Sequence, residues 1–466
     1  MDTSTPSTHP GPRQERQDTA PSGARPPGPS ARWLGLPLLR EMSRDYLGFM
    51  GRLHQRHGDL VYMRLMHYRD YSLAHPDQIR ELLIASHDHL VRWKRGIEVF
   101  TAVHGHSVLT AEGEDWKRRR QMLQPSFNPR QVEAFVPLMT QAADTALRRW
   151  DALSDFAFEH AMTQLTMDVI LRSLFSHNDE AQSRRAADAV HQISVIAMRE
   201  MYWPVSAPQW APWKAPKREA LRVLEQLVLS ELARRRERPE AQADLLQHLL
   251  QLRDEQGQPL SPRRLRDECM TTFLAGHETS AAALTWWGWC MAAHPQAQAR
   301  AIEEVDQVLQ GRVPTAEDLP RLRWLGLCVK EVLRLYPPAP ALFARTTTAP
   351  IRVGDYELPP GANVRLTPAI TQRDPRWFEE PDAFRPERFD PASGHAEIPR
   401  GAWLPFGAGP RVCLGSHFAL TEITLIAAMI LQRHRLTPVP GAPTPRPVLN
   451  IMLRPAQPLR LRLVRR

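Results

Sequence analysis

The sequence predicts a mainly α-helical protein with small antiparallel β-sheets, folded as one large domain. Three observations support this prediction. Apolar residues recur every three to four positions over most of the chain after residue 40, which is typical of amphipathic helices. Alternating apolar patterns, which indicate strands, occur only in short segments. Finally, no internal repeat and no linker-like break follows residue 30, so the length of 466 residues does not by itself require several domains.

The expected elements follow from these periods. Helices are expected over residues 46–57, 131–150, 161–175, 218–236, 270–291 and 322–335. Strands are expected over residues 59–66 and 68–73, and within 351–366 and 449–463. Pro and Gly interrupt the last two segments, so each is expected to contain more than one short strand.

The first 30 residues are rich in Pro, Ser, Thr and Gly and contain almost no apolar side chains. Such a segment cannot bury a core, so residues 1–30 are predicted to be a disordered leader, followed by one folded domain over residues 31–466. The leader lacks both the apolar region of a signal peptide and a run of about 20 apolar residues that could cross a bilayer. The protein is therefore expected to be soluble and cytoplasmic, without a membrane anchor.

Charge and cysteine usage exclude several classes of function. The net charge is +9 with a pI near 9.7, but the basic residues are spread along the chain without a DNA-binding helix or an aromatic-interleaved strand motif. We therefore expect no nucleic-acid partner. The four cysteines are never spaced as Cys-x-x-Cys, which argues against a disulfide framework or a zinc site and fits a reducing compartment.

Cys413 lies in a glycine-rich loop, Phe-Gly-Ala-Gly-Pro-Arg-Val-Cys-Leu-Gly, directly before an apolar helix. The glycines let the backbone fold tightly around the sulfur, and Gly415 permits close approach by a large flat group. Amides in such a turn stabilise a thiolate, and Arg411 is well placed to pair with a carboxylate. A buried structural cysteine is the alternative. Five positions of the loop, Phe406, Gly409, Arg411, Cys413 and Gly415, together suit a thiolate that binds haem iron, and this favours the ligand over the structural cysteine.

This loop resembles the haem-binding signature Phe-x-x-Gly-x-Arg-x-Cys-x-Gly of the cytochrome P450 superfamily and matches it at every fixed position. Three further segments match that family in the expected order, so the resemblance covers roughly residue 31 to the C-terminus. It implies a bacterial-type P450 catalytic domain over residues 31–466. In such a domain haem b (iron protoporphyrin IX) is buried between a long central helix and the helix after the cysteine loop. Cys413 would be the axial ligand, and Phe406 and Gly415 would contact the cofactor.

The second matching segment, Ala-Gly-His-Glu-Thr-Ser, lies within the predicted apolar helix 270–291. It resembles the family's oxygen-binding motif Ala-Gly-x-Glu-Thr. This resemblance implies that Gly276 lies beside the haem, that Thr279 hydrogen-bonds the iron-bound oxygen, and that Glu278 relays protons to it with water. The alternative is a threonine that hydrogen-bonds a carbonyl of its own helix, which is common.

The third and fourth segments contain Glu331-x-x-Arg334 and Pro-Glu-Arg388-Phe. Glu331 and Arg334 are three residues apart and share one helix face, and their apolar flanks suggest a buried ion pair. Such a pair needs further partners, and Arg388 could be one. The family resemblance implies a structural triad, and we assign these residues to stability and haem incorporation.

Haem carries two propionates, which the family neutralises with basic and indole donors. Trp116 and Arg120 are four residues apart on one helix face and resemble the family's Trp-x-x-x-Arg. Arg345, which follows a proline-rich turn, and Arg411 complete the expected set. Each arginine alone could lie on the surface, but as a group they suit bidentate pairing with carboxylates.

Substrate contacts are inferred from position only. Eight apolar residues would lie over the haem and favour a hydrophobic substrate. Each of them could instead belong to the hydrophobic core. They are Val99, Phe100, Val103, Val108, Phe273, Ala275, Leu342 and Phe343. Residues 198–216, rich in Met, Trp and Pro, fall where the family has a mobile lid over the substrate channel, or else form a loop that packs its aromatics on the body.

The histidine pairs 87/89 and 104/106 offer a rival metal ligand set. Their spacing is loose and no Cys or carboxylate pattern supports them, so we expect these histidines to face solvent or lie in loops.

Together these residues predict a haem-dependent monooxygenase that inserts one oxygen atom from O2 into a hydrophobic organic substrate. Motifs for a flavin or an iron–sulfur cluster are absent from the sequence, so the electrons would come from a separate ferredoxin or flavodoxin with its reductase. The basic run 117–120 is either a docking surface for that acidic partner or a solvated helix face. The protein is expected to be a monomer. A peroxide-using or isomerising haem-thiolate enzyme, and a non-catalytic haem sensor, stay open as alternatives.

Overall fold

The computed structural model describes residues 25–150, 156–176, 179–202, 208, 210–237, 244–254 and 256–466. Residues 1–24 of the predicted leader lie outside this set. Its last residues, 25–30, have neither helix nor strand but contact the folded body. The Tyr62 backbone N–H donates to the Pro27 carbonyl at 2.9 Å, and the Arg25 guanidinium lies 5.5 Å from the centre of the Tyr62 ring. The segment just before residue 31 therefore belongs with the fold.

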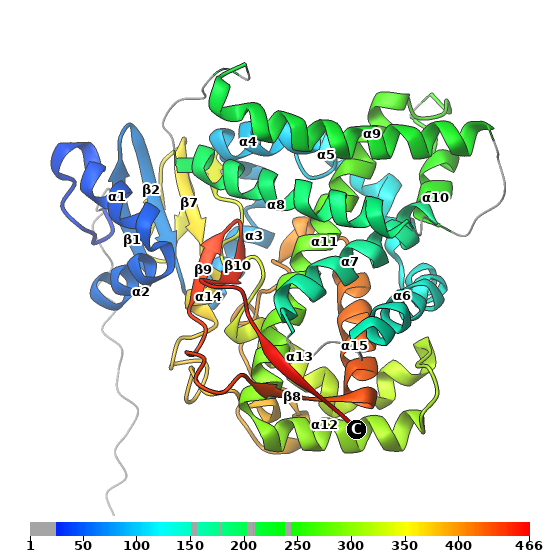
Figure 1. Ribbon diagram of the computed structural model, residues 1–466. Coiled ribbons are helices and arrows are strands. Elements are labelled where there is room, and N and C mark those ends of the chain that lie inside the picture. Colours follow the sequence, from blue (N-terminus) through cyan, green and yellow to red (C-terminus); the bar gives the residue numbers. More distant parts are fainter. Residues whose placement is uncertain are drawn as a thin grey trace, which may run out of the picture.

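Helices dominate the structure and surround one long central helix, α11 (Figure 1). The α-helices are α1 (Leu36–Arg44), α2 (Tyr46–His57), α3 (Pro76–Ile84), α4 (Lys94–His104), α5 (Gly113–Leu123), α6 (Pro129–Trp150), α7 (Phe158–Phe175), α8 (Glu180–Tyr202), α9 (Ala215–Glu237), α10 (Leu245–Gln251), α11 (Pro262–Ala293), α12 (Pro295–Leu309), α13 (Arg323–Leu335), α14 (Pro368–Thr371) and α15 (Ser416–Arg433). The 3-10 turns are η1 (Arg32–Gly35), η2 (His87–His89), η3 (Gln124–Phe127), η4 (Pro212–Lys214), η5 (Ala316–Arg321), η6 (Pro386–Phe389), η7 (Pro391–Ser393) and η8 (Gly409–Arg411).

Every helix expected from the sequence is present, and α11 shows why boundaries are harder to predict. This helix begins at Pro262 rather than at residue 270. Ser261 caps it by accepting a hydrogen bond from the Arg264 backbone N–H, and Pro262 suits the first helical position because it lacks an N–H. The first two turns are polar, so hydrophobic periodicity alone does not reveal them.

The strands form one mixed sheet and three small hairpin-like pairs. The five-stranded sheet has the order β1-β2-β7-β4-β3, with strands β1 (Leu60–Leu65), β2 (Tyr68–Leu73), β7 (Ala362–Leu366), β4 (Arg345–Thr347) and β3 (Leu90–Arg92). The pairs are β5 (Ile351–Val353) with β6 (Tyr356–Leu358), β8 (His434–Pro438) with β11 (Leu461–Arg465), and β9 (Pro447–Asn450) with β10 (Met452–Pro455). The predicted class is confirmed, with one refinement: β2 and β7 pair in parallel, whereas the other pairs are antiparallel.

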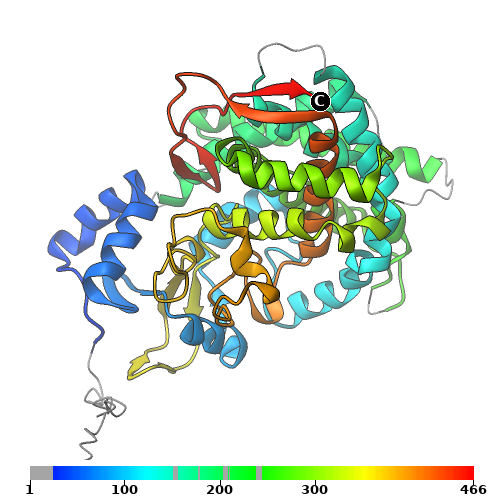
Figure 2. The same cartoon turned by 90° about the horizontal axis from the view of Figure 1, so that it is seen from below.

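The largest hydrophobic core lies among α6, α7, α11, α13 and α15, and a second one lies beneath the sheet. The sheet and the α1–α2 pair form one end of the molecule (Figure 1), while Figure 2 shows α12 and α13 side by side on the lower face. Among the described residues, no helix is long and apolar enough to span a membrane. The central helix α11 contacts α7, α13, α15 and α4, so it can carry side chains into a site in the interior.

Candidate functional site

The Cys413 loop connects η8 to α15 and is held by its own backbone. The Cys413 N–H donates to the Phe406 carbonyl at 2.9 Å. Gly409 has a φ of +73°, and a Cβ at this position would lie 2.2 Å from the Leu83 carbonyl oxygen, so only glycine fits. A Cβ at Gly415, in contrast, would meet no heavy atom within 4 Å. The loop is therefore packed against α3 on one side and leaves open space beside the cysteine on the other.

That open space belongs to a cavity of about 520 Å³. Cys413 is exposed to this cavity and is a free thiol; the other three cysteines are buried in the protein. Burial raises the pKa of the Cys413 thiol, whereas a backbone hydrogen bond from Gly415 and the charge of Arg120 lower it. A metal ion bonded to the sulfur would displace the thiol proton. Phe406, Arg411 and Gly415 also line the cavity, as predicted for cofactor contacts.

The central helix α11 supplies another wall of the same cavity. Thr272, Ala275, Gly276 and Thr279 line it at the three- and four-residue spacing of one helix face. The Thr279 hydroxyl donates to the Ala275 carbonyl at 2.7 Å, which is the back-bonded geometry considered as the alternative. A Cβ at Gly276 would lie 3.0 Å from a side-chain carbon of Ile170, so this glycine also permits close packing on α7.

Glu278 is bound to neighbouring elements in this structure. Its Oε1 accepts a hydrogen bond from Arg454 Nη2 at 3.0 Å, and its Oε2 accepts one from the Ser194 hydroxyl at 2.5 Å. Arg454 also pairs with Glu159 at 3.2 Å. The carboxylate thus ties α11 to α8 and β10 at the edge of the cavity, and Ser194 is a partner that sequence reasoning did not find.

Four arginines gather at another part of the cavity wall, namely Arg92 on β3, Arg120 on α5, Arg345 on β4 and Arg411 in the loop. Burial and the charge of Arg411 lower the pKa of Arg345 to about 10. Burial also lowers the pKa of Arg411, whose guanidinium lies 4.1 Å from the centre of the Trp116 ring. The predicted propionate residues Trp116, Arg120, Arg345 and Arg411 therefore come together.

One carboxylate, Glu112, accompanies this arginine cluster. It pairs with Arg411 and lies 3.6 Å from Arg92 Nη1. Nε and Nη1 of Arg92 are enclosed without a hydrogen-bond partner. Unpaired buried donors and an excess of positive charge are costly unless an anion occupies the space beside them. Sequence reasoning missed Arg92 because a lone arginine in a three-residue strand carries no motif.

The comparison with protein families decides what this arrangement is. The cytochrome P450 family model matches residues 26–463, which is nearly the whole chain and includes the Cys413 loop, α11 and the arginine cluster. The chain belongs to the cytochrome P450 family.

Several bacterial P450s are similar to this one. Cyclooctatin synthase from Streptomyces melanosporofaciens is 34% identical over 438 residues, which cover 92% of this chain and 94% of the relative. Cyclooctat-9-en-7-ol 5-monooxygenase from the same organism is 34% identical and covers 83% of this chain and 84% of its own length. Pentalenene oxygenase from Streptomyces avermitilis is 32% identical over 91% of this chain and 94% of the relative.

The residues of this P450 fit the haem that the family implies. The thiol of Cys413 is exposed to the cavity, and the absence of a side chain at Gly415 leaves room beside the loop. The arginine cluster supplies the positive charge that two carboxylates need, and Arg92 offers enclosed donors that have no acceptor. The protein is a P450 monooxygenase, and the residues around the cavity are suited to hold the haem of that family.

The predicted Glu331, Arg334 and Arg388 triad forms a fully paired buried network. Arg334 donates to both Glu331 oxygens at 2.7 and 2.8 Å, and Arg388 Nε donates to Glu331 Oε1 at 3.1 Å. The remaining Arg334 donors reach the carbonyls of Gln372, Pro381 and Ala383. None of these three side chains lines the cavity, which agrees with a structural role.

Most of the predicted substrate contacts do line the cavity, and one does not. Those on the wall are Val99, Phe100, Val103, Val108, Ala275, Leu342 and Phe343. Phe273 is instead fully buried in the main core, so its assignment to the substrate site is wrong. Both faces of α11 are apolar, so composition alone does not show which face borders the cavity. The structure shows that this face carries Ala275, Gly276 and Thr279.

His104 corrects a second expectation. It is neither in a loop nor facing solvent, but is the last residue of α4, buried and part of the cavity wall. The apolar Phe100 on the same helix was the available signal, because residues four positions apart share one helix face. His87, His89 and His106 are partly or fully exposed, and no group of three potential metal ligands occurs among the described residues.

The basic run 117–120 does not act as one surface. Arg119 is buried and pairs with Asp115 and Glu268, and Arg120 faces the cavity. Lys117 pairs with Glu114 at 2.9 Å. Arg118 is exposed and the Lys117 side chain is partly exposed, so only these two residues of the run face solvent.

The segment predicted as a lid is only partly described. Helix α8 continues to Tyr202, and Met198 and Met201 line the cavity from it. Trp203 lies outside the described residues. Trp210 and Trp213 are 76% and 63% exposed, so they do not pack their rings on the described body.

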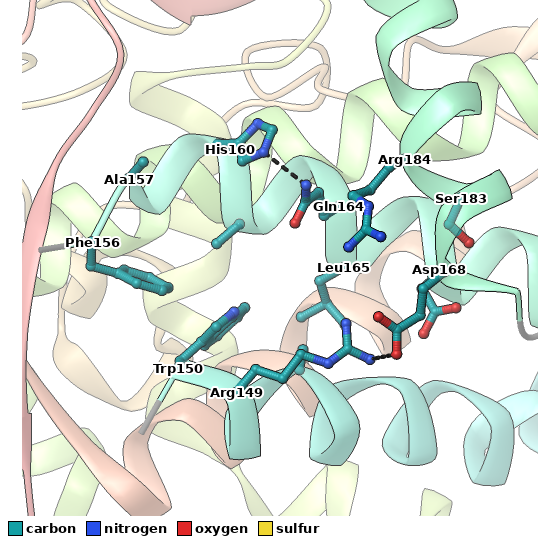
Figure 3. A pocket seen from close by; sticks show the side chains of 13 residues that line it. Arg149, Trp150, Phe156, Ala157, His160, Gln164, Leu165, Asp168, Ser183 and Arg184 are labelled. Atoms are coloured by element: carbon teal, nitrogen blue, oxygen red, sulfur yellow. Dashed lines mark hydrogen bonds and ion pairs between the residues drawn. The ribbon is translucent and has the colours of Figure 1, made fainter. Parts of the chain in front are cut away.

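A second hollow of about 310 Å³ lies among α6, α7 and α8 (Figure 3) and shares no lining residue with the first. Trp150 and Phe156 form one wall, with ring centres 5.0 Å apart. His160 and Gln164 are hydrogen-bonded to each other, and Arg149 pairs with Glu180. The polar groups of this hollow are thus largely paired among themselves.

Proposed function

We propose that this P450 uses haem b and O2 to insert one oxygen atom into a C–H or C=C bond of a cyclic terpenoid. The observation that carries the proposal is that Cys413, Thr279 and the arginine cluster line one cavity with largely apolar walls. Pentalenene and cyclooctat-9-en-7-ol, after which two relatives are named, are terpenoids, and the apolar walls suit the same class.

Haem, when bound, supplies the one-electron and O2 chemistry, which thiolate ligation by Cys413 favours. Arg345 and Arg411 would hold its carboxylates and so orient the ring in the cavity. Phe100, Leu342 and Phe343 exclude water and orient the hydrocarbon.

Thr279 and Glu278 handle protons in this proposal. The Thr279 hydroxyl would leave the Ala275 carbonyl and donate to an oxygen atom in the cavity. Glu278 would accept a proton at Oε1 or Oε2 after one of its present partners, Arg454 or Ser194, moves away. Both residues line the cavity from α11.

The electrons would come from a separate ferredoxin or flavodoxin with its reductase. This part rests on the absence of flavin and iron–sulfur motifs in the sequence and on the general behaviour of the family. A peroxide-using or isomerising enzyme, or a haem sensor, would share the Cys413 loop but would not need a hydroxyl at residue 279. The presence of Thr279 favours O2 activation.

Replacement of Thr279 by Ala tests the proposal. We expect NADPH consumption to continue while product formation falls by about 10-fold or more and hydrogen peroxide is released, because proton delivery is then misdirected. Thr272→Ala is the matched control: Thr272 also lines the cavity and donates to a carbonyl of its own helix, at 2.9 Å. Unchanged coupling in Thr279→Ala would refute the proton-handling role and favour one of the alternatives.

A further inference from the structure

His104 is the unusual residue of the cavity wall. It lies at the end of α4 with only 7% of its surface exposed, in a wall formed by Val99, Phe100 and Val103. Its ring stacks on that of Phe100, with centres 5.6 Å apart and planes at 26°. The stacking holds the imidazole in one plane within this wall.

The two ring nitrogens have different surroundings. Nδ1 is enclosed by protein and has no hydrogen-bond partner. Nε2 is not enclosed in this way and has no partner among the described residues, so it is open to the cavity that His104 lines. Burial lowers the pKa of His104 to about 3, so the ring is neutral near pH 7. Its single proton is best placed on Nε2, because a donor at Nδ1 would have no acceptor.

Other polar groups of the wall are already engaged. The hydroxyls of Thr272 and Thr279 donate to carbonyls of α11, and those of Thr271 and Ser280 donate to Ser107 and Glu422. The Ser194 hydroxyl is held by Glu278. The Ser173 hydroxyl has no partner but is enclosed. The Trp93 indole N–H likewise has no partner but is enclosed, and Trp116 lies against Arg411 in the arginine cluster. His104 therefore presents a neutral donor that is available to a ligand in this apolar region.

We propose that His104 donates a hydrogen bond from Nε2 to an oxygen atom already present on the substrate. This inference rests on the proposed function and narrows its substrate class to terpenoid alcohols and ketones rather than hydrocarbons. A hydrocarbon would leave Nε2 buried without an acceptor, and a site built for a hydrogen bond rejects a ligand that lacks the group. The reaction that supplies this substrate must then already have introduced an oxygen atom.

The test is isothermal titration calorimetry of the haem-loaded enzyme with pairs of compounds that differ by one hydroxyl, such as cedrol and cedrane, extended to a small panel of cyclic terpenoid alcohols and their parent hydrocarbons. We expect the wild type to bind the alcohols more tightly. His104→Phe should weaken alcohol binding about 10-fold and leave hydrocarbon binding within about 2-fold, since one neutral hydrogen bond is lost. His104→Gln, which keeps a donor, should restore part of the preference.

Phe100→Leu is the matched control, because it alters the packing of the same wall without removing a donor. It should weaken both members of each pair by similar factors. The inference is overturned if no alcohol of the panel binds the wild type more tightly than its parent hydrocarbon, or if His104→Phe weakens both equally. Calorimetry needs no turnover, so a failure of the proposed oxygenation would be seen separately, as alcohol binding without product.

Discussion

Two groups of buried arginines in this P450 show opposite electrostatic states. In the triad, Arg334 is completely buried and all of its donors are satisfied by Glu331 and by backbone carbonyls. In the arginine cluster, Glu112 is the accompanying carboxylate, and Arg92 keeps enclosed donors without partners. The first group is complete within the protein, whereas in the second a single carboxylate, Glu112, stands beside several arginines.

The difference shows how structural charges can be told from ligand-binding ones. A buried charge is tolerated only when its partners offset the loss of water. Where the chain supplies those partners, as around Arg334, the charges stabilise the fold. Where it does not, as around Arg92 and Arg345, the fold carries the cost, and a ligand that supplies the missing charge stabilises the protein on binding.

The largest effect is expected for Arg334→Leu. This substitution leaves Glu331 without its main partner in the interior, and breaking a buried ion pair costs about 3–5 kcal/mol. Urea unfolding of the haem-loaded protein measures the loss. Arg148→Leu is the control, because Arg148 pairs with Asp144 at a side-chain exposure of 74% and should change stability by less than about 0.5 kcal/mol. A loss below about 1 kcal/mol in Arg334→Leu would mean that the triad is not a structural unit.

An intermediate effect is expected at Glu422, a buried carboxyl that has no cation beside it. Burial raises its pKa to about 8, and the hydrogen bond from the Ser280 hydroxyl at 2.5 Å opposes this only in part. Between about pH 5 and pH 8 the unfolded carboxyl is ionised while the folded one keeps its proton. Unfolding then releases a proton, so the stability of the wild type falls as the pH rises through this window.

Glu422→Gln cannot titrate, so its stability relative to the wild type should rise between pH 5 and pH 8, by roughly 1–3 kcal/mol. Urea unfolding at several pH values measures this difference. Glu225→Gln, at a partly exposed position on α9, is the control and should show no such trend. A stability difference that stays constant across the window would mean that Glu422 is ionised in the folded protein.

The smallest effect on the fold is expected for Arg345→Leu. Because Arg345 lies near Arg411 and hydrogen-bonds only the Phe343 carbonyl within the described chain, its removal should cost the polypeptide little. The loss should appear in haem retention, by about 1–2 kcal/mol, since one charged hydrogen bond to a propionate is removed. The rate of haem transfer to an acceptor protein measures this. A loss of unfolding free energy as large as that of Arg334→Leu would remove the distinction between the two groups.

The parts of the site that could be predicted from the sequence are those formed by residues that lie close together along the chain. The Cys413 loop is closed by its own glycines and by the Cys413–Phe406 hydrogen bond, so its motif can be read locally. Likewise Glu331 and Arg334 meet because they are three residues apart on α13. The errors lie elsewhere: Phe273 was placed on the wrong face of α11, and His104 was assigned to a loop or to solvent.

The sequence by itself determined the helical class, the cysteine loop and the pairing of Glu331 with Arg334, because each depends on spacing within one element or turn. Only the tertiary structure decided that Arg92, Ser194 and His104 belong to the site. These residues come from separate elements, and the burial of each follows from what packs around it. Burial turns an ordinary histidine into a neutral donor and leaves an ordinary arginine with nitrogens that have no hydrogen-bond partner, and neither change is visible in the order of the amino acids.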